Sequence, residues 1–394
     1  MPGRADRQRW ATLALFLGNG IAIGTWAGAI PRLQHALALS PARLSLALLA
    51  FAAGAVIAMP LAGRLASRVG AGRLAIAAAF LLAVALMLPA MAPDLPLLVA
   101  AAVAMGIANG SMDVAMNARA SEVERRRGRP LMSSFHAGFS LGGLAGAAAA
   151  GSLAGAGLGL AACLAVGAAV DAGLAGLAAP WIGNERHAPA ARGPGRGFAW
   201  PSAAMLGLCA AAVLCMMTEG AMMDWSAVYL VRVAGAGAGA AAFGYAAFSM
   251  AMAAGRLAGD RVVGAFGAPR VARTGGLLAA SGLALAVLVP VPAAGIAGFA
   301  LVGCGLANVV PTVFSAAARL GVTPARGVAT VATIGYAGFL AGPPLIGGIA
   351  TFAGLRAGLG LLAAAAATIG AMARGLATSP GRRRAPARAP AGQT

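Results

Sequence analysis

Charged residues are scarce in this sequence of 394 residues, and their scarcity excludes an ordinary soluble domain. They make up 10% of the chain, whereas a soluble domain contains about 25%. Hydrophobic residues account for 60%, and the mean hydropathy is +0.84. This composition predicts an integral membrane protein whose principal partner is the lipid bilayer.

Lysine is absent, so the formal net charge of +19 comes from arginine alone. The 29 arginines occur in short clusters between apolar runs. A nucleic-acid-binding domain gathers its basic residues on one surface, so this distribution argues against a nucleic-acid partner.

Sequence signals for metal binding, disulfides and catalysis are also missing. The four cysteines lie in apolar runs without CxxC spacing, which favours small buried side chains over metal ligands or disulfides. No Walker loop, HExxH motif, nucleophile elbow or nicotinamide fingerprint stands in a suitable context. The sequence therefore predicts no cofactor, no metal site, no enzyme and no ATP-driven pump.

What the sequence does contain is a series of apolar segments of about 20 residues, the length that spans a bilayer as a helix. Twelve can be placed, at 11–30, 44–63, 74–92, 96–118, 132–154, 158–180, 203–230, 238–258, 271–290, 293–317, 327–350 and 355–374. The expected fold class is an all-α membrane protein with twelve transmembrane helices.

The arginines also predict the topology, because cytoplasmic loops carry an excess of positive charge. With the N-terminus in the cytoplasm, 25 arginines fall in inner segments and 4 in outer segments. Both termini are then cytoplasmic, in a bacterial inner membrane. The first basic stretch and apolar run resemble a signal peptide, but no small-x-small cleavage site follows, so we expect a retained first helix.

The longest inner loop, 182–202, predicts a cytoplasmic linker between an N-terminal half, 1–181, and a C-terminal half, 203–378. The tail 379–394 is rich in Pro and Arg and is expected to be disordered. Three short matches between the halves share an offset of 199 or 200 residues: GIAN 106–109 with GLAN 305–308, TWAGAI 25–30 with DWSAVY 224–229, and HAGFSLGG 136–143 with YAGFLAGP 336–343. They predict two parallel six-helix repeats, an arrangement found in secondary transporters with the solute site between the halves.

Two loops carry a family resemblance. The stretches 63–73 (GRLASRVGAGR) and 255–270 (GRLAGDRVVGAFGAPR) resemble the G-x-L-x-D-R-x-G-R-R loop that occurs in each half of the major facilitator superfamily. Ser67 stands where the first loop usually has an acid, and Asp260 lies one place late in the second. DVAMNARASEVE, GRPLMSSFHAGFSLGG and the Asp-Trp pair at 224–225 resemble the fucose-permease-like branch and related bacterial permeases.

This resemblance implies a major facilitator fold, which we expect to act as a monomer, with halves that rock around a central site. It also makes the inner-loop residues candidates for a cytoplasmic gate that forms in one conformation and opens in the other, although they could equally serve only to set topology. These candidates are Arg64, Arg68, Arg256, Asp260 and Arg261.

Acidic residues inside apolar segments are the strongest functional candidates, since a charge is costly in the membrane. Burial disfavours the charged form of a carboxylate, so such a group is able to bind and release a proton. Glu219, near the middle of its segment, is the first proton-coupling candidate and Asp113 the second; Asp224 lies closer to the outer face. The alternative is that each is a structural hydrogen-bonding centre. The sequence indicates no function for Asp171.

Other polar residues fit a central solute site, because amides and hydroxyls both donate and accept hydrogen bonds. Asn109, Asp113 and Asn117 are spaced i, i+4 and i+8, so they share one helix face. The indole of Trp225 offers a face for stacking on a sugar ring, or else packs between helices. The substrate-binding candidates are Asn19, Asn109, Asn117, His136, Trp225, Asn308, Thr312 and Tyr336.

The predicted function is secondary active transport of a small polar solute, a sugar being one candidate, by proton-coupled symport. Two alternatives stay open. The first is a proton-coupled efflux antiporter for drugs or organic cations, in which the same acids bind the cation. The second is a membrane sensor that has this fold but transports nothing.

Overall fold

The computed structural model describes residues 4–127, 131–183, 202–320 and 324–373. Within these ranges the secondary structure is helical, with no strand. The elements are α1 (Arg4–Ala36), α2 (Pro41–Val69), α3 (Ala71–Met87), η1 (Leu88–Met91), α4 (Leu95–Arg127), α5 (Met132–Gly155), α6 (Leu160–Ala178), α7 (Ala203–Arg232), α8 (Ala238–Phe266), α9 (Ala268–Leu288), α10 (Pro292–Leu306), α11 (Val309–Leu320), α12 (Pro324–Gly335) and α13 (Ala337–Met372).

Each of the predicted apolar segments coincides with helix, but the helices are longer and some are broken. The stretch 293–317 is interrupted at 307–308, between α10 and α11. The last two predicted segments fall in α12 and α13, and α13 itself changes direction at Gly354, whose φ of 80° is non-helical.

Ten helical stretches in the described ranges are long and apolar enough to cross a membrane. α8, which contains Arg256 and Arg261, is not among them, and Thr330–Met372 is a single stretch across Gly354. The count of twelve therefore stays a prediction.

Helix starts follow from local capping chemistry. Ser40 accepts a hydrogen bond from the Arg43 backbone N–H at 3.3 Å and precedes Pro41, which begins α2. Ser202 caps α7 in the same way through the Met205 N–H. Glu124 accepts from the backbone N–H groups of Leu131 and Met132, so a carboxylate lies at the start of α5.

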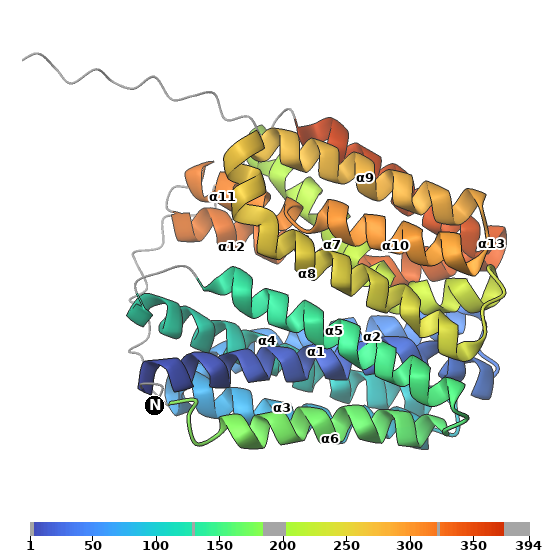
Figure 1. Cartoon of the computed structure of the whole chain (residues 1–394), viewed down its shortest axis with the longest axis horizontal. Helices are drawn as coiled ribbons and strands as arrows, with labels where there is room; N and C mark the ends of the chain where they lie inside the picture. The colour runs from blue at the N-terminus through green and yellow to red at the C-terminus, as the bar shows by residue number, and fades with distance from the viewer. Residues whose placement is uncertain (1–3, 128–130, 184–201, 321–323, 374–394) are drawn as a thin grey trace, which may run out of the picture.

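The helices form two groups that lie one above the other in Figure 1. The first group, α1–α6, is the lower one, and the second group, α7–α13, is the upper one. Contacts between the groups come from α5 with α8, α2 with α13, and α1 with α7 and α8. The predicted linker is described only at Ile182 and Gly183, and the predicted disordered tail lies outside the described residues.

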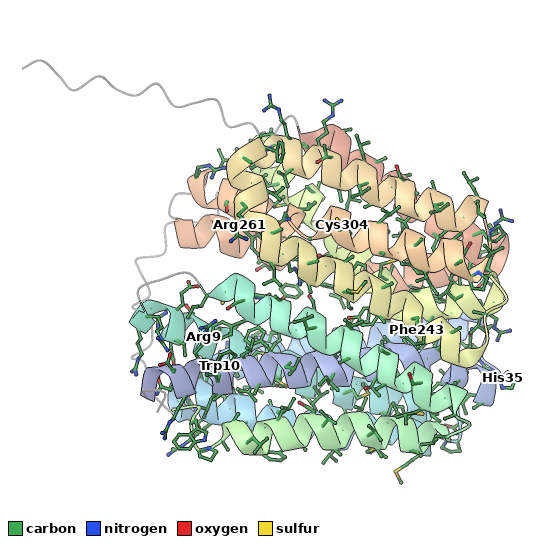
Figure 2. The ribbon with its side chains drawn as sticks, viewed as in Figure 1. Arg9, Trp10, His35, Phe243, Arg261 and Cys304 are labelled. Carbon is green, nitrogen blue, oxygen red and sulfur yellow. The ribbon has the colours of Figure 1, made fainter. Side chains whose placement is uncertain are left out.

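The bundle has two distinct ends. The basic end, where α1 begins and α2, α4 and α8 end, carries Arg9 and Arg261, which lie to the left in Figure 2. His35 marks the opposite end. Trp10 and Trp181 are exposed at the basic end, as expected of aromatic anchors at a membrane interface.

The two groups pack closely at the opposite end. A Cβ placed on Gly151 of α5 would lie 2.5 Å from the Gly239 carbonyl oxygen of α8. A Cβ on Gly347 of α13 would lie 2.7 Å from the Ser45 Oγ of α2. The backbones of α5 and α8 therefore meet directly at Gly151 and Gly239, and the Gly347 backbone packs against the Ser45 side chain.

Candidate functional site

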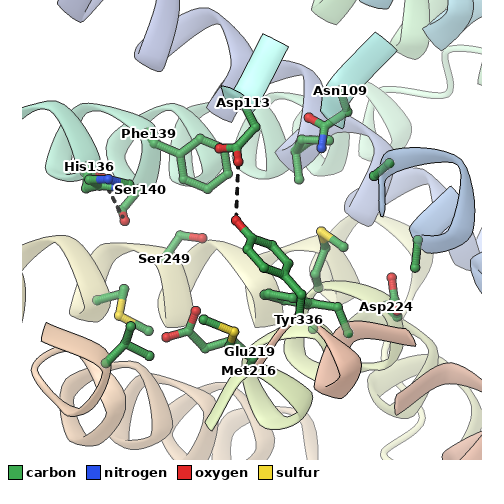
Figure 3. Close-up of a pocket in the computed structure, with 18 of the residues that line it drawn as sticks. Asn109, Asp113, His136, Phe139, Ser140, Met216, Glu219, Asp224, Ser249 and Tyr336 are labelled. Atoms are coloured by element: carbon green, nitrogen blue, oxygen red, sulfur yellow. Dashed lines mark hydrogen bonds between the residues drawn. The ribbon is translucent and has the colours of Figure 1, made fainter. Parts of the chain in front are cut away.

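A cavity of about 350 Å³ lies between the two helix groups (Figure 3). Its walls come from α1, α2, α4 and α5 of the first group and from α7, α8, α11, α12 and α13 of the second. The polar lining residues are Asn109, Asp113, His136, Ser140, Glu219, Asp224, Tyr245, Ser249, Arg256 and Tyr336.

Asp113 and Tyr336 join the two groups across this cavity. The Tyr336 hydroxyl donates a hydrogen bond to Asp113 Oδ2 at 3.3 Å (Figure 3). The Asn117 amide donates to the other carboxylate oxygen of Asp113 at 3.0 Å. Tyr336 lies at the junction of α12 and α13, so the helix break presents its side chain to α4.

Arg256 makes a second polar link between the groups. Its guanidinium lies 3.6 Å from Glu219 Oε1 on α7 and donates to the Ser140 hydroxyl on α5 at 3.2 Å. Both partners of the ion pair are largely buried, with side-chain exposures of 18% and 17%. Glu219 and Arg256 belong to the second group and Ser140 to the first. The hydrogen bond to Ser140 therefore connects the ion pair to the first helix group.

Asp224 differs from the other two cavity acids. Its residue is 4% exposed, and it forms no hydrogen bond or ion pair with any residue of the described ranges. In Figure 3 it lies on the far side of Tyr336 from His136 and Ser140. Since α7 runs from the basic end, Asp224 lies nearer the opposite end than Glu219 does.

The rest of the wall is mostly apolar and unusually rich in sulfur and aromatic rings. We use the term apolar lining for its five methionines and five phenylalanines, Met59, Met116, Met216, Met223, Met252, Phe51, Phe139, Phe248, Phe314 and Phe339. Methionine side chains are flexible and polarizable, so they adapt to irregular shapes.

Several sequence candidates meet in this cavity. The three proton-coupling candidates line it, together with Asn109, His136, Tyr336 and the gate candidate Arg256. Asn117 is not among the lining residues but contacts one of them, Asp113.

Four other substrate-binding candidates lie outside the lining. Trp225 follows Asp224 on α7 but is fully buried and does not line the cavity, whereas stacking on a sugar requires an exposed ring face there. Asn308 donates to the Gly255 carbonyl at 3.0 Å and thereby fastens the α10–α11 break to α8. The Thr312 hydroxyl bonds its own helix at Val309, and Asn19 donates to the Met116 sulfur at 3.7 Å.

The remaining gate candidates lie at the basic end. Arg64, Arg68 and Arg261 are exposed there. Ser67, at the position of the missing acid, donates to the Arg64 carbonyl at 2.7 Å. The Asp260 side chain lies outside the described residues.

Sequence reasoning missed Tyr245 and Ser249, which line the cavity from α8. With Met252 and Arg256 they are spaced by four, three and four residues, so they form one face of that helix. The pattern could have been recognised once Arg256 was singled out.

Asp171 lies outside the cavity. It is 1% exposed on α6, and neither carboxylate oxygen has a hydrogen-bond partner in the described part of the chain. A Cβ on Gly18 of α1 would come within 2.6 Å of its Oδ1, so the carboxylate packs against the α1 backbone.

Comparison with known proteins agrees with this architecture. The family model of the Major Facilitator Superfamily matches residues 12–330. An MFS-type transporter of Yersinia pestis is 36% identical over 93% of this chain and 95% of its own. Membrane protein MosC of Rhizobium meliloti is 36% identical over 86% of this chain and 83% of its own.

Solved structures show the same fold at low identity. A point mutant of the nucleoside transporter NupG superposes with a TM-score of 0.74 at 13% identity, over 95% of this chain and 100% of that one. A bacterial homologue of the human lysosomal transporter Spinster, in an inward-facing and unoccupied conformation, gives 0.66 at 16% identity, over 95% of each chain.

These matches confirm the predicted all-α major facilitator fold and identify the chain as a transporter and not an enzyme. The protein therefore belongs to the Major Facilitator Superfamily and is a multi-pass membrane transporter.

Proposed function

We propose that the protein is a proton-coupled secondary active transporter that moves a small organic solute with polar groups by alternating access. The observation that supports this most is the position of Asp113 and Glu219. Each acid lies in the central cavity, and each belongs to a polar link that joins the two helix groups, one directly to Tyr336 and the other through Arg256 to Ser140.

The chemistry of coupling follows from these links. An ionised Glu219 attracts Arg256, and a protonated one does not, so proton binding removes the Coulomb part of the ion pair. Arg256 is then free to change its partners. Because its hydrogen bond to Ser140 joins the second helix group to the first, a change of partner alters the contact between the groups. Protonation at Glu219 thereby biases the relative position of the groups, which is the step that a proton-driven carrier requires.

We further propose that residues 1–181 and 203–378 are the two rocking halves and that the basic end is cytoplasmic, in the inner membrane. The excess of arginine at the basic end supports this orientation. The close backbone contacts at the opposite end then seal the outer face in the conformation described here.

The test is transport into proteoliposomes. A proton gradient should drive accumulation or extrusion of at least one solute from a panel of sugars, organic acids, nucleosides and organic cations, and an uncoupler should abolish it. Nucleosides belong in the panel because NupG, a structural neighbour, is a nucleoside transporter. Gradient-independent movement of the solute would refute proton coupling, and no movement of any solute would favour a sensor.

Efflux of organic cations is the second candidate, and one observation favours it. Three carboxylates line the cavity, whereas Arg256 is the one guanidinium among its lining residues. Addition of a symported solute should alkalinise the outside medium. Cation–proton exchange should instead acidify the compartment that the cation leaves, because protons enter it in exchange.

A further inference from the structure

We infer that Asp224 anchors the positive charge of an organic cation whose apolar body lies against the apolar lining. This assignment rests on the proposed function and makes it more specific, since it separates one substrate-binding acid from two coupling acids.

The Asp224 carboxylate lacks protein partners within the described ranges. Glu219 has Arg256, and Asp113 has Tyr336 and Asn117, but Asp224 has no polar partner in the described ranges. It is 4% exposed and lines the cavity. A buried carboxylate without a partner is costly, so this position requires a ligand or a proton.

The charge of the cavity as a whole also favours a cation. The titratable and charged groups facing it are Asp113, His136, Glu219, Asp224, Tyr245 and Arg256, together with the phenol of Tyr336. Arg256 compensates Glu219, so the cavity still holds two carboxylates and no further guanidinium among its lining residues. A cationic solute supplies the missing charge, whereas an anionic one would add to the excess.

The remaining wall suits the apolar body of such a cation. Flexible thioethers and aromatic faces bind apolar and cationic groups of varied shape, through dispersion and cation–π attraction. Trp225, the aromatic residue that the sequence offered for stacking on a sugar ring, is not among the lining residues.

Cation binding at Asp224 is linked to proton release. The Asp224 carboxyl can hold either a proton, as an O–H group, or the cation, because the two compete for the same oxygens. When a cation binds, that O–H bond ionises, the proton passes to bulk water, and the carboxylate pairs with the cation. Charge is conserved, and cation binding therefore releases protons and weakens as protons become more abundant.

The test is isothermal titration of the purified full-length protein in detergent with benzyltrimethylammonium. This probe has a permanent charge and an aromatic body, and it neither donates a hydrogen bond through N–H nor loses a proton. We expect binding that is stronger above neutral pH than below, with a buffer-dependent enthalpy that shows proton release. Asp224→Asn should weaken binding by about tenfold or more and remove the proton release.

Two further variants make the result specific. Asp224→Glu should retain binding, because it keeps the carboxylate. Asp171→Asn removes an acid of α6 that also lacks a hydrogen-bond partner in the described part of the chain but lies outside the cavity, so this variant should bind the probe as wild type does. Melting curves must show that each variant is folded. If Asp224→Asn is not folded, the test is whether the wild type loses the probe at low pH while Asp224→Glu still binds the probe above neutral pH.

The inference is overturned if the wild type does not bind the probe, or if Asp224→Asn binds it equally well. Failure of the cation site can be distinguished from failure of the proposed function. Gradient-driven transport of uncharged solutes without probe binding would reject the cation site alone. Probe binding that depends on Asp224, without gradient-driven transport, would reject the proposed function alone.

Discussion

Tyr336 and Asp113 are separated by 223 residues in the chain, yet the Tyr336 hydroxyl donates to an Asp113 carboxylate oxygen across the central cavity. The bond joins α4 of the first helix group to the α12–α13 junction of the second. An intramolecular hydrogen bond contributes about 0.5–1.5 kcal/mol, and this one contributes only while the two groups keep their present relative position.

Tyr336→Phe should therefore lower the population of this conformation several-fold. The measurement is the rate of disulfide formation between cysteines placed at Gly28 and Ala242, which report contact between α1 and α8. Tyr229→Phe is the matched control, because the Tyr229 hydroxyl bonds the Ala286 carbonyl within the second group. Equal rates in both variants would show that the Tyr336 bond does not hold the groups together.

Glu219→Gln should abolish gradient-driven accumulation and leave counterflow exchange of the same solute measurable. Glutamine keeps an oxygen that can accept a hydrogen bond from Arg256, but it cannot bind and release a proton. The loss in accumulation should be about tenfold or greater, since the driving force is disconnected.

Asp171→Asn is again the control, because that acid packs against Gly18 outside the cavity. Its accumulation should match that of the wild type. If Glu219→Gln accumulated solute as the wild type does, Glu219 could not be the proton carrier.

The sequence identified the acids of this site better than it identified the polar stripes. Glu219, Asp113 and Asp224 are recognisable because a charge inside an apolar segment is rare and costly, whatever the rotation of the helix. Helical spacing, in contrast, shows which residues share a face but not which way that face points. Asn109 and Asn308 illustrate this, since they are equivalent in the internal repeat and only Asn109 lines the cavity.

Helix breaks account for much of the remaining difference. The interruption at 307–308 turns the Asn308 amide toward Gly255, and the one at Tyr336 turns a phenol into the cavity. A break changes the rotation of every residue that follows it, so a continuous 3.6-residue period no longer places Thr312 relative to the cavity. The cross-cavity partners of the acids also depend on how two distant segments pack, which one sequence does not report.

Gly20→Ala should destabilise the first helix group. The new Cβ would overlap the Phe139 carbonyl oxygen of α5, and a backbone atom in a helix cannot rotate away. Overpacking of this kind costs about 1–3 kcal/mol, so we expect a lower melting temperature by fluorescence-detected size exclusion. Gly63→Ala adds the same methyl group where nothing lies within 4 Å, and it should melt as the wild type does. A wild-type melting curve for Gly20→Ala would mean that α1 and α5 are not packed this closely.

Alternating access predicts that the contact between α1 and α8 opens during each cycle. A Cβ on Gly28 would lie 3.2 Å from the Ala242 Cβ and no nearer than 3.6 Å to a backbone atom of another helix, and the Cβ atoms of a disulfide are about 3.5–4.5 Å apart. In a background without the native cysteines that still transports, the pair Gly28→Cys and Ala242→Cys should cross-link under oxidation and stop transport, and a reductant should restore it. The control pair, Gly335→Cys and Ala212→Cys, has a similar Cβ separation of 3.1 Å but lies within the second group. It should cross-link without loss of transport, because a rigid half does not change its internal contacts as it rocks. Undiminished transport by the oxidised α1–α8 pair would exclude separation of the groups at this end as a step of the cycle.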